Sequence, residues 1–218
     1  MSSGPLRGRF ITLEGIEGVG KSTNLDFIAA HLQASGVEVV VTREPGGVPL
    51  AERIRELLLA PGSHAPTAMA ELLLMFAARS CHLEQLVWPA LEAGQWVVCD
   101  RFTDASYAYQ GAGRGCGDEA VHMLEKLVQR SFRPDLTLLL DADWEVSRTR
   151  RAQRGHTDRF EQETRQFFDR VRAAYLQRAA QDPERMVVVP AAGTLDEVRV
   201  AIVGQLDRLI RCYLNNAV

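Results

Sequence analysis

The sequence has 218 residues, enough for one domain with a substantial hydrophobic core, and its formal net charge of −3 gives no overall electrostatic case for binding nucleic acid. The four cysteines lack metal-ligand spacing, the five histidines include no His-x-x-x-His pair, and no apolar run is long enough to span a membrane. These features argue against a structural zinc site, a nucleic-acid partner and a membrane span, and they favour a reducing, cytoplasmic location.

Residues 1–8 have no long apolar core and are predicted to form a flexible N-terminal tail, which leaves residues 9–218 as a single domain. Short apolar runs predict strands at residues 9–14, 37–42, 96–100, 136–141 and 186–189. Apolar residues at helical spacing predict helices at residues 24–32, 50–59, 67–92, 117–130, 144–151, 163–181 and 195–213. Because continuous apolar strands are typical of sheets covered on both faces, this alternation predicts a doubly wound α/β fold, with a five-stranded parallel sheet and helices on both faces.

A glycine-rich loop lies between the first predicted strand and the first predicted helix. Residues 15–23, Gly-Ile-Glu-Gly-Val-Gly-Lys-Ser-Thr, match Gly-x-x-x-x-Gly-Lys-[Ser/Thr], the P-loop of nucleotide-binding proteins. In that setting backbone N–H groups and the positive end of a helix dipole converge on a polyphosphate such as that of ATP. Lys21 is expected to reach the β- and γ-phosphates, and the Ser22 hydroxyl to ligate Mg²⁺. The loop residues expected to bind ATP are Gly15, Glu17, Gly18, Val19, Gly20, Lys21, Ser22 and Thr23.

Further candidate site residues lie where the other strands end, because ligands of doubly wound sheets bind at the carboxyl ends of the strands. The second strand leads into residues 42–47, Thr-Arg-Glu-Pro-Gly-Gly, and the third ends in Asp100 followed by Arg101. P-loop proteins place a carboxylate that holds Mg²⁺, usually through water, at such a strand end, although Asp is also a common turn residue. Beside a P-loop the metal role is favoured for Asp100, and Arg101 could bind a second anion.

Two candidate substrate contacts also have plain structural explanations. Phe76 and Arg79 lie three residues apart and can share one helix face, where Phe offers a stacking surface for a base and Arg a forked hydrogen-bond donor. In this leucine-rich helix, an aromatic residue is more often part of the core. Arg55 reads as a solvated helix charge paired with Glu52 or Glu56. The residues alone therefore favour the structural interpretation for both.

Residues 148–159 carry five arginines in twelve residues. Such a basic cluster can be a solvated helix face or an RNA contact, but beside a P-loop a mobile arginine-rich lid, at about residues 146–160, is favoured. Arg150 and Arg154, at i and i+4, would share one helix face toward the phosphates of ATP. Because phosphoryl transfer spreads negative charge over the moving group, one well-placed arginine can contribute on the order of 10³–10⁵ in rate, and Arg154 is our candidate for it.

Taken together, these motifs resemble the bacterial-type thymidylate kinases of the P-loop nucleoside monophosphate kinase family. The resemblance runs from about residue 9 to 195, and its most specific element is the Thr-Arg-Glu-Pro-Gly-Gly hexapeptide. Eukaryotic-type members carry an arginine in the P-loop, whereas the bacterial type supplies arginines from the lid; here residues 17–19 contain none and the lid is rich in them. The segments that carry the resemblance are residues 15–23, 42–47, 100–102 (Asp-Arg-Phe), 107–111 (Tyr-Ala-Tyr-Gln-Gly) and 158–161 (Asp-Arg-Phe-Glu).

The resemblance implies a P-loop NTPase fold and transfer of the ATP γ-phosphoryl group to dTMP, giving dTDP and ADP on the path to dTTP. It also implies Mg²⁺ as the cofactor and a homodimeric assembly. Little acid–base chemistry is needed, because a phosphate-monoester nucleophile with a second pKa of ~6 is already deprotonated at neutral pH. Catalysis would come from neutralising and aligning two charged phosphates inside a closed site. The residues expected to do so are Lys21, Asp100, Arg101 and Arg154.

At the matching positions, the resemblance reverses the structural interpretations of Phe76 and Arg55. Phe76 would stack on thymine, and Arg79 would hydrogen-bond its edge. Arg55 and Arg101 would hold the phosphate of the acceptor nucleotide.

The resemblance also implies contacts around the sugar and the rest of the base pocket. Glu17 would contact the sugar 3′-hydroxyl, and Tyr109 would lie near C2′, where it would disfavour a ribonucleotide. Ser106 or Gln110 would line the base pocket, and Pro45 would belong to the same acceptor site.

Alternatives remain open from the sequence. The nearest is another P-loop kinase that acts on a different nucleotide or nucleoside. A second is an ATPase switch, whose output is hydrolysis and partner binding. The sequence weighs against a switch, because two separate sets of arginines that could bind anions imply a second phosphate substrate. An inactive nucleotide-binding scaffold is disfavoured because Lys21, Ser22 and Asp100 are intact.

Overall fold

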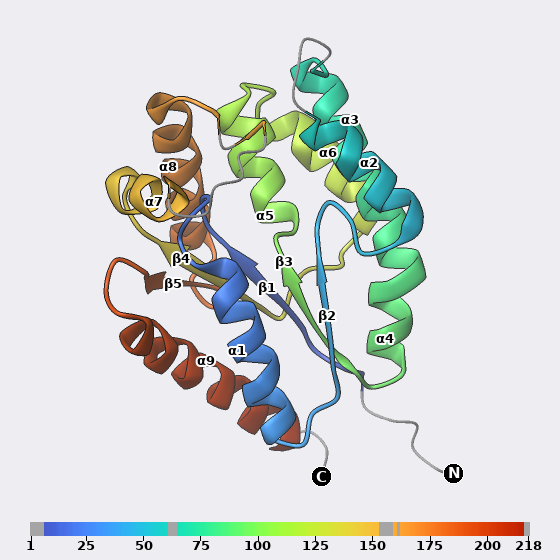
Figure 1. The fold of residues 1–218 in the computed structure, drawn as a ribbon. Helices are drawn as coiled ribbons and strands as arrows, with labels where there is room; N and C mark the ends of the chain where they lie inside the picture. The colour runs from blue at the N-terminus through green and yellow to red at the C-terminus, as the bar shows by residue number, and fades with distance from the viewer. Residues whose placement is uncertain (1–6, 61–64, 153–158, 161, 216–218) are drawn as a thin grey trace.

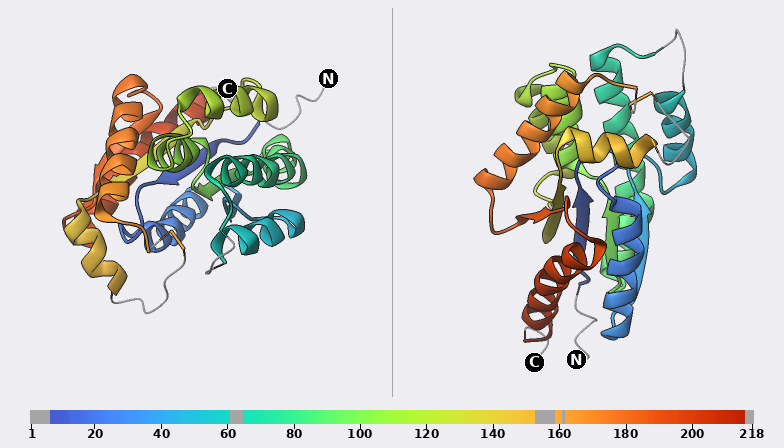
Figure 2. Two further views of the ribbon diagram at one scale, coloured as in Figure 1. Left: turned by 90° about the horizontal axis from the view of Figure 1, so that it is seen from above. Right: turned by 60° about the vertical axis from the view of Figure 1, so that its left-hand side comes forward.

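The structure, a computed structural model, describes residues 7–60, 65–152, 159–160 and 162–215. Within these residues, five parallel strands form one sheet in the order β2-β3-β1-β4-β5, and helices pack against both of its faces (Figures 1 and 2). The predicted doubly wound α/β fold with a five-stranded parallel sheet is therefore confirmed. The strands are β1 (Phe10–Glu14), β2 (Val39–Arg43), β3 (Trp96–Asp100), β4 (Leu136–Asp141) and β5 (Met186–Pro190).

The strand order decides where a ligand can bind. The central strand β1 is completely buried, with β3 on one side and β4 on the other. The chain first winds to β2 and β3 and then reverses to β4 and β5, so a crevice is expected beyond the carboxyl end of β1. Leu13 of β1 and Arg43 of β2 both lie level with Asp100 of β3. The ends of three neighbouring strands thus meet at one edge of the sheet.

Helices make up most of the rest of the described chain. Residues 67–92, predicted as one helix, form three consecutive segments, because a π-helical turn (η1) interrupts the α-helical pattern. The segments up to the third strand are α1 (Lys21–Ala34), α2 (Pro49–Leu59), α3 (Ala68–His82), η1 (Leu83–Val87) and α4 (Trp88–Glu92). Those after it are α5 (Thr103–Ser106), η2 (Tyr107–Gly113), α6 (Asp118–Gln129), α7 (Trp144–Ala152), α8 (Arg165–Gln181) and α9 (Leu195–Asn215).

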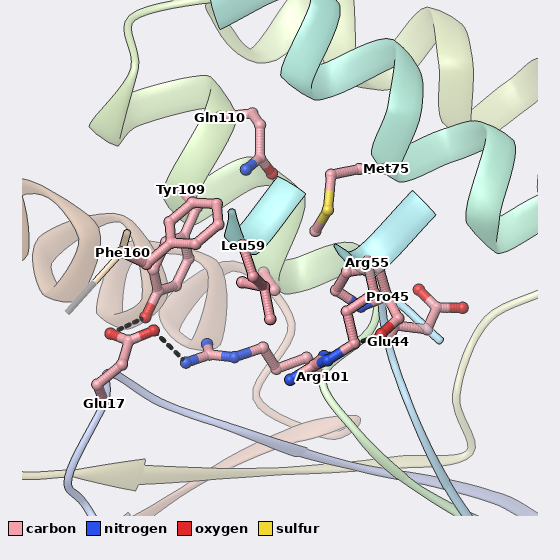
Figure 3. Close-up of a pocket in the computed structure, with 11 residues that line it drawn as sticks. Glu17, Glu44, Pro45, Arg55, Leu59, Met75, Arg101, Tyr109, Gln110 and Phe160 are labelled. Carbon is pink, nitrogen blue, oxygen red and sulfur yellow. Dashed lines mark hydrogen bonds and ion pairs between the residues drawn. The ribbon is translucent and has the colours of Figure 1, made fainter. Parts of the chain in front are cut away.

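The helical path of α5 and η2 is one that the sequence pattern does not predict. Every residue from 103 to 111 is buried. A helix buried on all sides has no polar face, so it lacks the apolar periodicity that identifies surface helices. This path carries Ser106, and it brings Tyr109 and Gln110 to the cavity that the P-loop residue Glu17 also lines (Figure 3).

Two predicted segments lie partly outside the described residues. In the tail, residues 1–6 are outside them, whereas Gly8 is buried and its N–H donates to the Leu91 carbonyl oxygen at 2.8 Å. In the lid, α7 is described, but residues 153–158, which include Arg154, are not. Among the described helices, none is long and apolar enough to cross a membrane.

Candidate active site

The chain passes from β1 into α1 through the predicted P-loop. Gly15, Gly18 and Gly20 have φ angles of 134°, 82° and 98°, a region that residues with a side chain rarely adopt. Space also requires glycine, because a Cβ on Gly15 would lie 2.4 Å from the Leu140 carbonyl oxygen and one on Gly18 would lie 2.4 Å from that of Ser147. Gly20 is the N-cap of α1. The loop therefore stands at a helix N-terminus, as an anion site of this kind requires.

Lys21 is the first residue of α1, and its side chain folds back under the loop. The ammonium Nζ donates to the carbonyl oxygens of Gly15 and Ile16, each at 3.0 Å. Burial, and then the nearby positive charge of Arg101, lower the pKa of Lys21 to about 8. The lysine thus lies at the phosphate-binding loop, with a charge that a bound anion would stabilise.

Arg101 connects the end of β3 to the P-loop. Its Nη2 donates to Glu17 Oε1 at 2.7 Å (Figure 3), and its Nη1 donates to the Gly15 carbonyl oxygen at 2.9 Å. The Tyr109 hydroxyl donates to Glu17 Oε2 at 2.6 Å, and the Arg101 guanidinium carbon lies 4.6 Å from the centre of the Tyr109 ring. The structure therefore brings together three candidate residues from three separate segments.

A cavity of about 70 Å³ opens beside this cluster (Figure 3). On its α2 side, Arg55 donates to the Pro45 carbonyl oxygen at 2.9 Å. Leu59, Met75 and Phe160, which the sequence did not identify as site residues, supply apolar walls. The predicted acceptor-site residues that line the cavity are Glu17, Pro45, Arg55, Arg101, Tyr109 and Gln110.

Three other predicted residues, Phe76, Arg79 and Ser106, are not among those that line the cavity. Phe76 and Arg79 are 2% and 1% exposed, and the Arg79 guanidinium covers the Phe76 ring at 4.5 Å from its centre. Arg79 donates through Nε to Glu44 at 2.7 Å and through Nη2 to Ser106 at 3.0 Å. Its buried Nη1 has no hydrogen-bond partner within the described residues. Contact of Phe76 or Arg79 with a base stays a prediction.

Asp100 and Ser22, the predicted magnesium ligands, lie at the end of β3 and in the first turn of α1. Ser22 is exposed, and Asp100 Oδ1 is buried without a hydrogen-bond partner among the described residues. A carboxylate and a hydroxyl oxygen suit Mg²⁺, which keeps several waters and takes phosphate oxygens as further ligands. Within the described chain, no cluster of three or more His, Cys, Asp or Glu side chains could hold a metal. An ion at this place would therefore depend on phosphate ligands.

The described part of the lid is fixed to the body of the protein. Arg150 donates to the Ala191 carbonyl oxygen, in the loop after β5, at 2.7 Å. The Ser147 hydroxyl donates to the Glu17 carbonyl oxygen and so joins α7 to the P-loop. Arg154 lies outside the described residues. Contact of Arg150 or Arg154 with ATP stays a prediction.

Comparisons with known proteins agree with this geometry. The family model described as thymidylate kinase matches residues 13–202. The chain belongs to the thymidylate kinase family. It is 56% identical over 205 residues to the thymidylate kinase of Pseudomonas savastanoi pv. phaseolicola, and the matched region covers 94% of this chain and 98% of that protein. Over 196 residues it is 57% identical to the thymidylate kinase of Hahella chejuensis, covering 90% of this chain and 94% of that protein.

A solved structure of the thymidylate kinase family has the same fold. The crystal structure of thymidylate kinase from Ehrlichia chaffeensis superimposes with a TM-score of 0.74 at 31% sequence identity, over 92% of this chain and 99% of that chain. The predicted P-loop kinase fold is therefore confirmed.

In this member of the thymidylate kinase family, the buried carboxylate of Glu44 is a site feature that the sequence left unassigned. It accepts a hydrogen bond from Arg79 at 2.7 Å and lies 2.9 Å from Nδ1 of His82, whose Nε2 lies 2.8 Å from the Thr42 hydroxyl. Burial alone would raise the pKa of Glu44, but Arg79 and His82 hold it below its ordinary value. The charged carboxylate therefore fixes the orientation of Arg79. The signal available in the sequence was a charged residue two positions after the strand predicted at residues 37–42.

Glu14, the last residue of β1, is a second buried carboxyl group beside the site. It accepts hydrogen bonds from the Phe102 N–H and the Tyr175 hydroxyl, each at 2.7 Å. Burial, with a contribution from Asp104, raises its pKa from 4.5 to about 8, although Arg101 acts in the opposite direction. Between these two values the folded protein keeps a proton that the unfolded chain has lost.

We expect the free energy of unfolding to decrease as the pH rises from 5 to 8. The variant Glu14→Gln should remove the part of this decrease that comes from Glu14. One such group contributes a slope of at most about 1.4 kcal/mol per pH unit. Urea unfolding of both proteins at several pH values measures this slope, and the difference isolates Glu14 because all other titrating groups are shared. Equal pH dependence in the two proteins would contradict the raised pKa.

Proposed function

We propose that this chain phosphorylates dTMP with the γ-phosphoryl group of ATP, giving dTDP and ADP for dTTP synthesis. One observation carries the proposal: at the edge of the cavity, the Arg101 guanidinium contacts both the Gly15 carbonyl oxygen of the P-loop and the Glu17 carboxylate. A donor phosphate on the loop and an acceptor phosphate in the cavity would meet at this arginine. The names of the relatives above support dTMP as the acceptor.

The site would promote the reaction mainly by neutralising and aligning the two phosphate groups. Lys21 would reach the terminal phosphates of ATP from the loop, while Arg101 and Arg55 would hold the acceptor phosphate against them. No general base is needed, because the attacking phosphate oxygen is already deprotonated at neutral pH. Holding the two phosphates in line removes most of the entropic cost of their encounter.

We propose Mg²⁺ as the cofactor, held by the Ser22 hydroxyl and, through water, by Asp100. When bound, the ion would neutralise charge on the β- and γ-phosphates of ATP. The buried Asp100 Oδ1, which has no partner in the described chain, supports this role because a buried carboxylate oxygen is costly to leave unsatisfied.

Selection of a deoxyribose would come from Glu17 and Tyr109. The Glu17 carboxylate is held by Arg101 on one side and by the Tyr109 hydroxyl on the other, so it can accept a hydrogen bond from a 3′-hydroxyl in a fixed direction. The Tyr109 ring is itself packed edge-on against Phe160 and Phe167. A 2′-hydroxyl placed against this ring would lose its hydration without gaining a partner.

ADP release measured across a set of acceptors tests the function. The set contains dTMP, dUMP, dCMP, AMP and thymidine, each with and without Mg²⁺, together with ATP alone. We expect rapid turnover with dTMP and Mg²⁺ and only slow turnover otherwise. Faster turnover of another acceptor would indicate a different nucleotide kinase. ATP turnover that is the same with and without dTMP would indicate an ATPase.

We further propose that the enzyme is a cytoplasmic homodimer. A cytoplasmic location is supported by the cysteines, since all four, each within the described residues, are free thiols. The dimer is supported by exposed apolar side chains on α3 and α6, two helices that pack against each other, because exposed apolar surface can mark an interaction site. These side chains are Met69, Leu73, Met123 and Leu127, with exposed fractions of 47%, 50%, 61% and 77%.

Placing one charge on each of these two helices, in the double variant Leu73→Glu and Leu127→Glu, should convert the dimer to a monomer because like charges would oppose each other across the interface. Analytical ultracentrifugation at several protein concentrations measures the change. The matched control is Leu57→Glu, which makes the same change at an exposed leucine on a different helix, α2. A wild-type protein that sediments as a monomer would rule out the dimer.

A further inference from the structure

The chain makes a strained turn at Arg101, between β3 and α5. Arg101 has a φ angle of 70°, in the left-handed region that residues with a side chain rarely adopt. Two hydrogen bonds to β1 hold this turn. The Arg101 N–H donates to the Leu13 carbonyl oxygen at 3.0 Å, and the Phe102 N–H donates to Glu14 Oε1 at 2.7 Å. The backbone is therefore fixed on both sides of Arg101, which sets the direction in which its side chain leaves the strand.

The guanidinium of Arg101 has a further partner that the proposed function does not use. Its Nη1, which donates to the Gly15 carbonyl oxygen of the P-loop, also donates to the Tyr175 hydroxyl at 3.2 Å. Tyr175 belongs to α8, 74 residues further along the chain, and is 1% exposed. It is not among the residues that line the cavity proposed for the acceptor nucleotide. We therefore expect any influence of Tyr175 on the acceptor to pass through Arg101.

Glu14 decides which way the Tyr175 hydroxyl points. A hydroxyl group carries one proton, and Tyr175 donates that proton to Glu14 Oε2 at 2.7 Å. The lone pairs of the hydroxyl oxygen are therefore left to accept from Arg101. If the proton pointed at the guanidinium instead, two donors would face each other. The carboxyl group that holds the turn at Phe102 thus also directs, through Tyr175, the guanidinium of Arg101.

The Tyr175 hydroxyl can orient Arg101 without cancelling its positive charge. Burial, and then the nearby Glu14, raise the pKa of this hydroxyl well above its ordinary value, so it is uncharged at neutral pH. The other side chain at the fork, the Glu17 carboxylate, accepts from Nη2 at 2.7 Å and carries an opposing charge. An arginine that stabilises transferring phosphate needs both a fixed direction and an available charge. A neutral acceptor provides the direction and preserves the charge.

We propose that Tyr175 is a positioning residue for phosphoryl transfer: its hydroxyl, directed by Glu14, fixes the Arg101 guanidinium where the donor and acceptor phosphates meet. This inference rests on the proposed function. The role requires no contact with either phosphate, because its effect is to keep the fork in one orientation before the substrates bind. Loss of the hydroxyl should therefore change kcat and KM for dTMP, which depend on Arg101, and leave KM for ATP unchanged.

Tyr175→Phe removes the hydroxyl and keeps the ring, which packs edge-on against the Tyr109 ring with centres 6.3 Å apart. The variant should lower kcat/KM for dTMP about tenfold, the size of one hydrogen bond to a charged group. KM for ATP should stay within about twofold of wild type. An unchanged kcat/KM for dTMP, or an equal rise in KM for ATP, would contradict the proposal.

A double-mutant cycle with Arg101→Lys tests whether Tyr175 acts through Arg101. In Arg101→Lys the fork is already lost, so adding Tyr175→Phe should lower kcat/KM for dTMP by less than about twofold further. A further tenfold loss in the combined variant would mean that the two side chains act independently, and the positioning role would be wrong.

The matched control is Tyr107→Phe, which removes another tyrosine hydroxyl that donates to a glutamate, here Glu125 at 2.5 Å. Tyr107 is not among the residues that line the cavity, so this variant should keep kcat/KM for dTMP within about twofold of wild type. Thermal unfolding records the stability lost with each hydroxyl. If the two variants lost activity in proportion to their lost stability, the hydroxyl of Tyr175 would have a structural role only.

Crystal structures of wild type and Tyr175→Phe give a readout that does not depend on turnover. The Arg101 guanidinium should take one orientation in wild type and more than one in the variant. The same single orientation in both would overturn the proposal. If wild type fails to use dTMP, the proposed function fails, and the two crystal structures still decide whether Tyr175 positions Arg101.

Discussion

Replacing Lys21 with Met is expected to lower kcat for phosphoryl transfer by about 10³-fold or more, with the fold intact. The ammonium is held 3.0 Å from two P-loop carbonyl oxygens and is the loop's own positive charge at the transferring phosphate. Methionine fills a similar volume without the charge. Because burial lowers the pKa of Lys21 to about 8, the fold disfavours its charged form, and losing that charge should not destabilise the protein.

The chain supplies its own control, because its other lysine, Lys126, is exposed on α6. Lys126→Met should leave kcat within about twofold of wild type, since a solvated surface charge is screened from the site. Coupled ADP release and thermal unfolding of the two variants give the comparison. A Lys21→Met enzyme with kcat within about tenfold of wild type would contradict the assigned role.

Arg101→Lys should lower kcat/KM for dTMP by about 10²–10³-fold, although the charge is kept. The forked guanidinium contacts Glu17, the Gly15 carbonyl oxygen and, at 3.2 Å, the Tyr175 hydroxyl. A single ammonium cannot hold this geometry and an acceptor phosphate together. The Glu17 carboxylate would lose its fixed direction, so both kcat and KM for dTMP should change.

Arg133→Lys makes the same chemical change in a solvated ion pair. Arg133 lies 2.7 Å from Asp182 and its side chain is 57% exposed, so this variant should behave as wild type. Steady-state kinetics with varied dTMP and varied ATP separate the two cases. If Arg101→Lys kept kcat/KM within about threefold of wild type, the fork would not be needed and the role of Arg101 in joining the two phosphates would be wrong.

The features predicted well from the sequence are those whose causes are local. The P-loop needs Gly15, Gly20, Lys21 and Ser22 within one short segment, so its chemistry can be read directly from consecutive residues. Asp100 could be placed at the same edge because parallel strands end together. The helical path at residues 103–113 could not be predicted, since burial on every side removes the periodic pattern on which prediction depends.

The ion-pair partners of buried charged side chains could not be predicted from sequence patterns. Glu71 and Arg159 are 88 residues apart, and Glu44 and Arg79 are 35 apart. In the sequence each reads as one more charged residue, because its partner depends on how the helices pack. The i, i+3 spacing placed Phe76 and Arg79 on one face, but it could not show that the guanidinium covers the ring.

The sequence by itself determined the parallel sheet, the phosphate loop and the edge of the sheet at which the site lies. Each of these follows from a short apolar run or a fixed glycine spacing, which acts within a few residues. Only the tertiary structure decided which carboxylate pairs with which arginine, and that Phe160 lines the acceptor cavity. Those choices depend on burial and on distances between segments far apart in the chain, and neither is encoded in local periodicity.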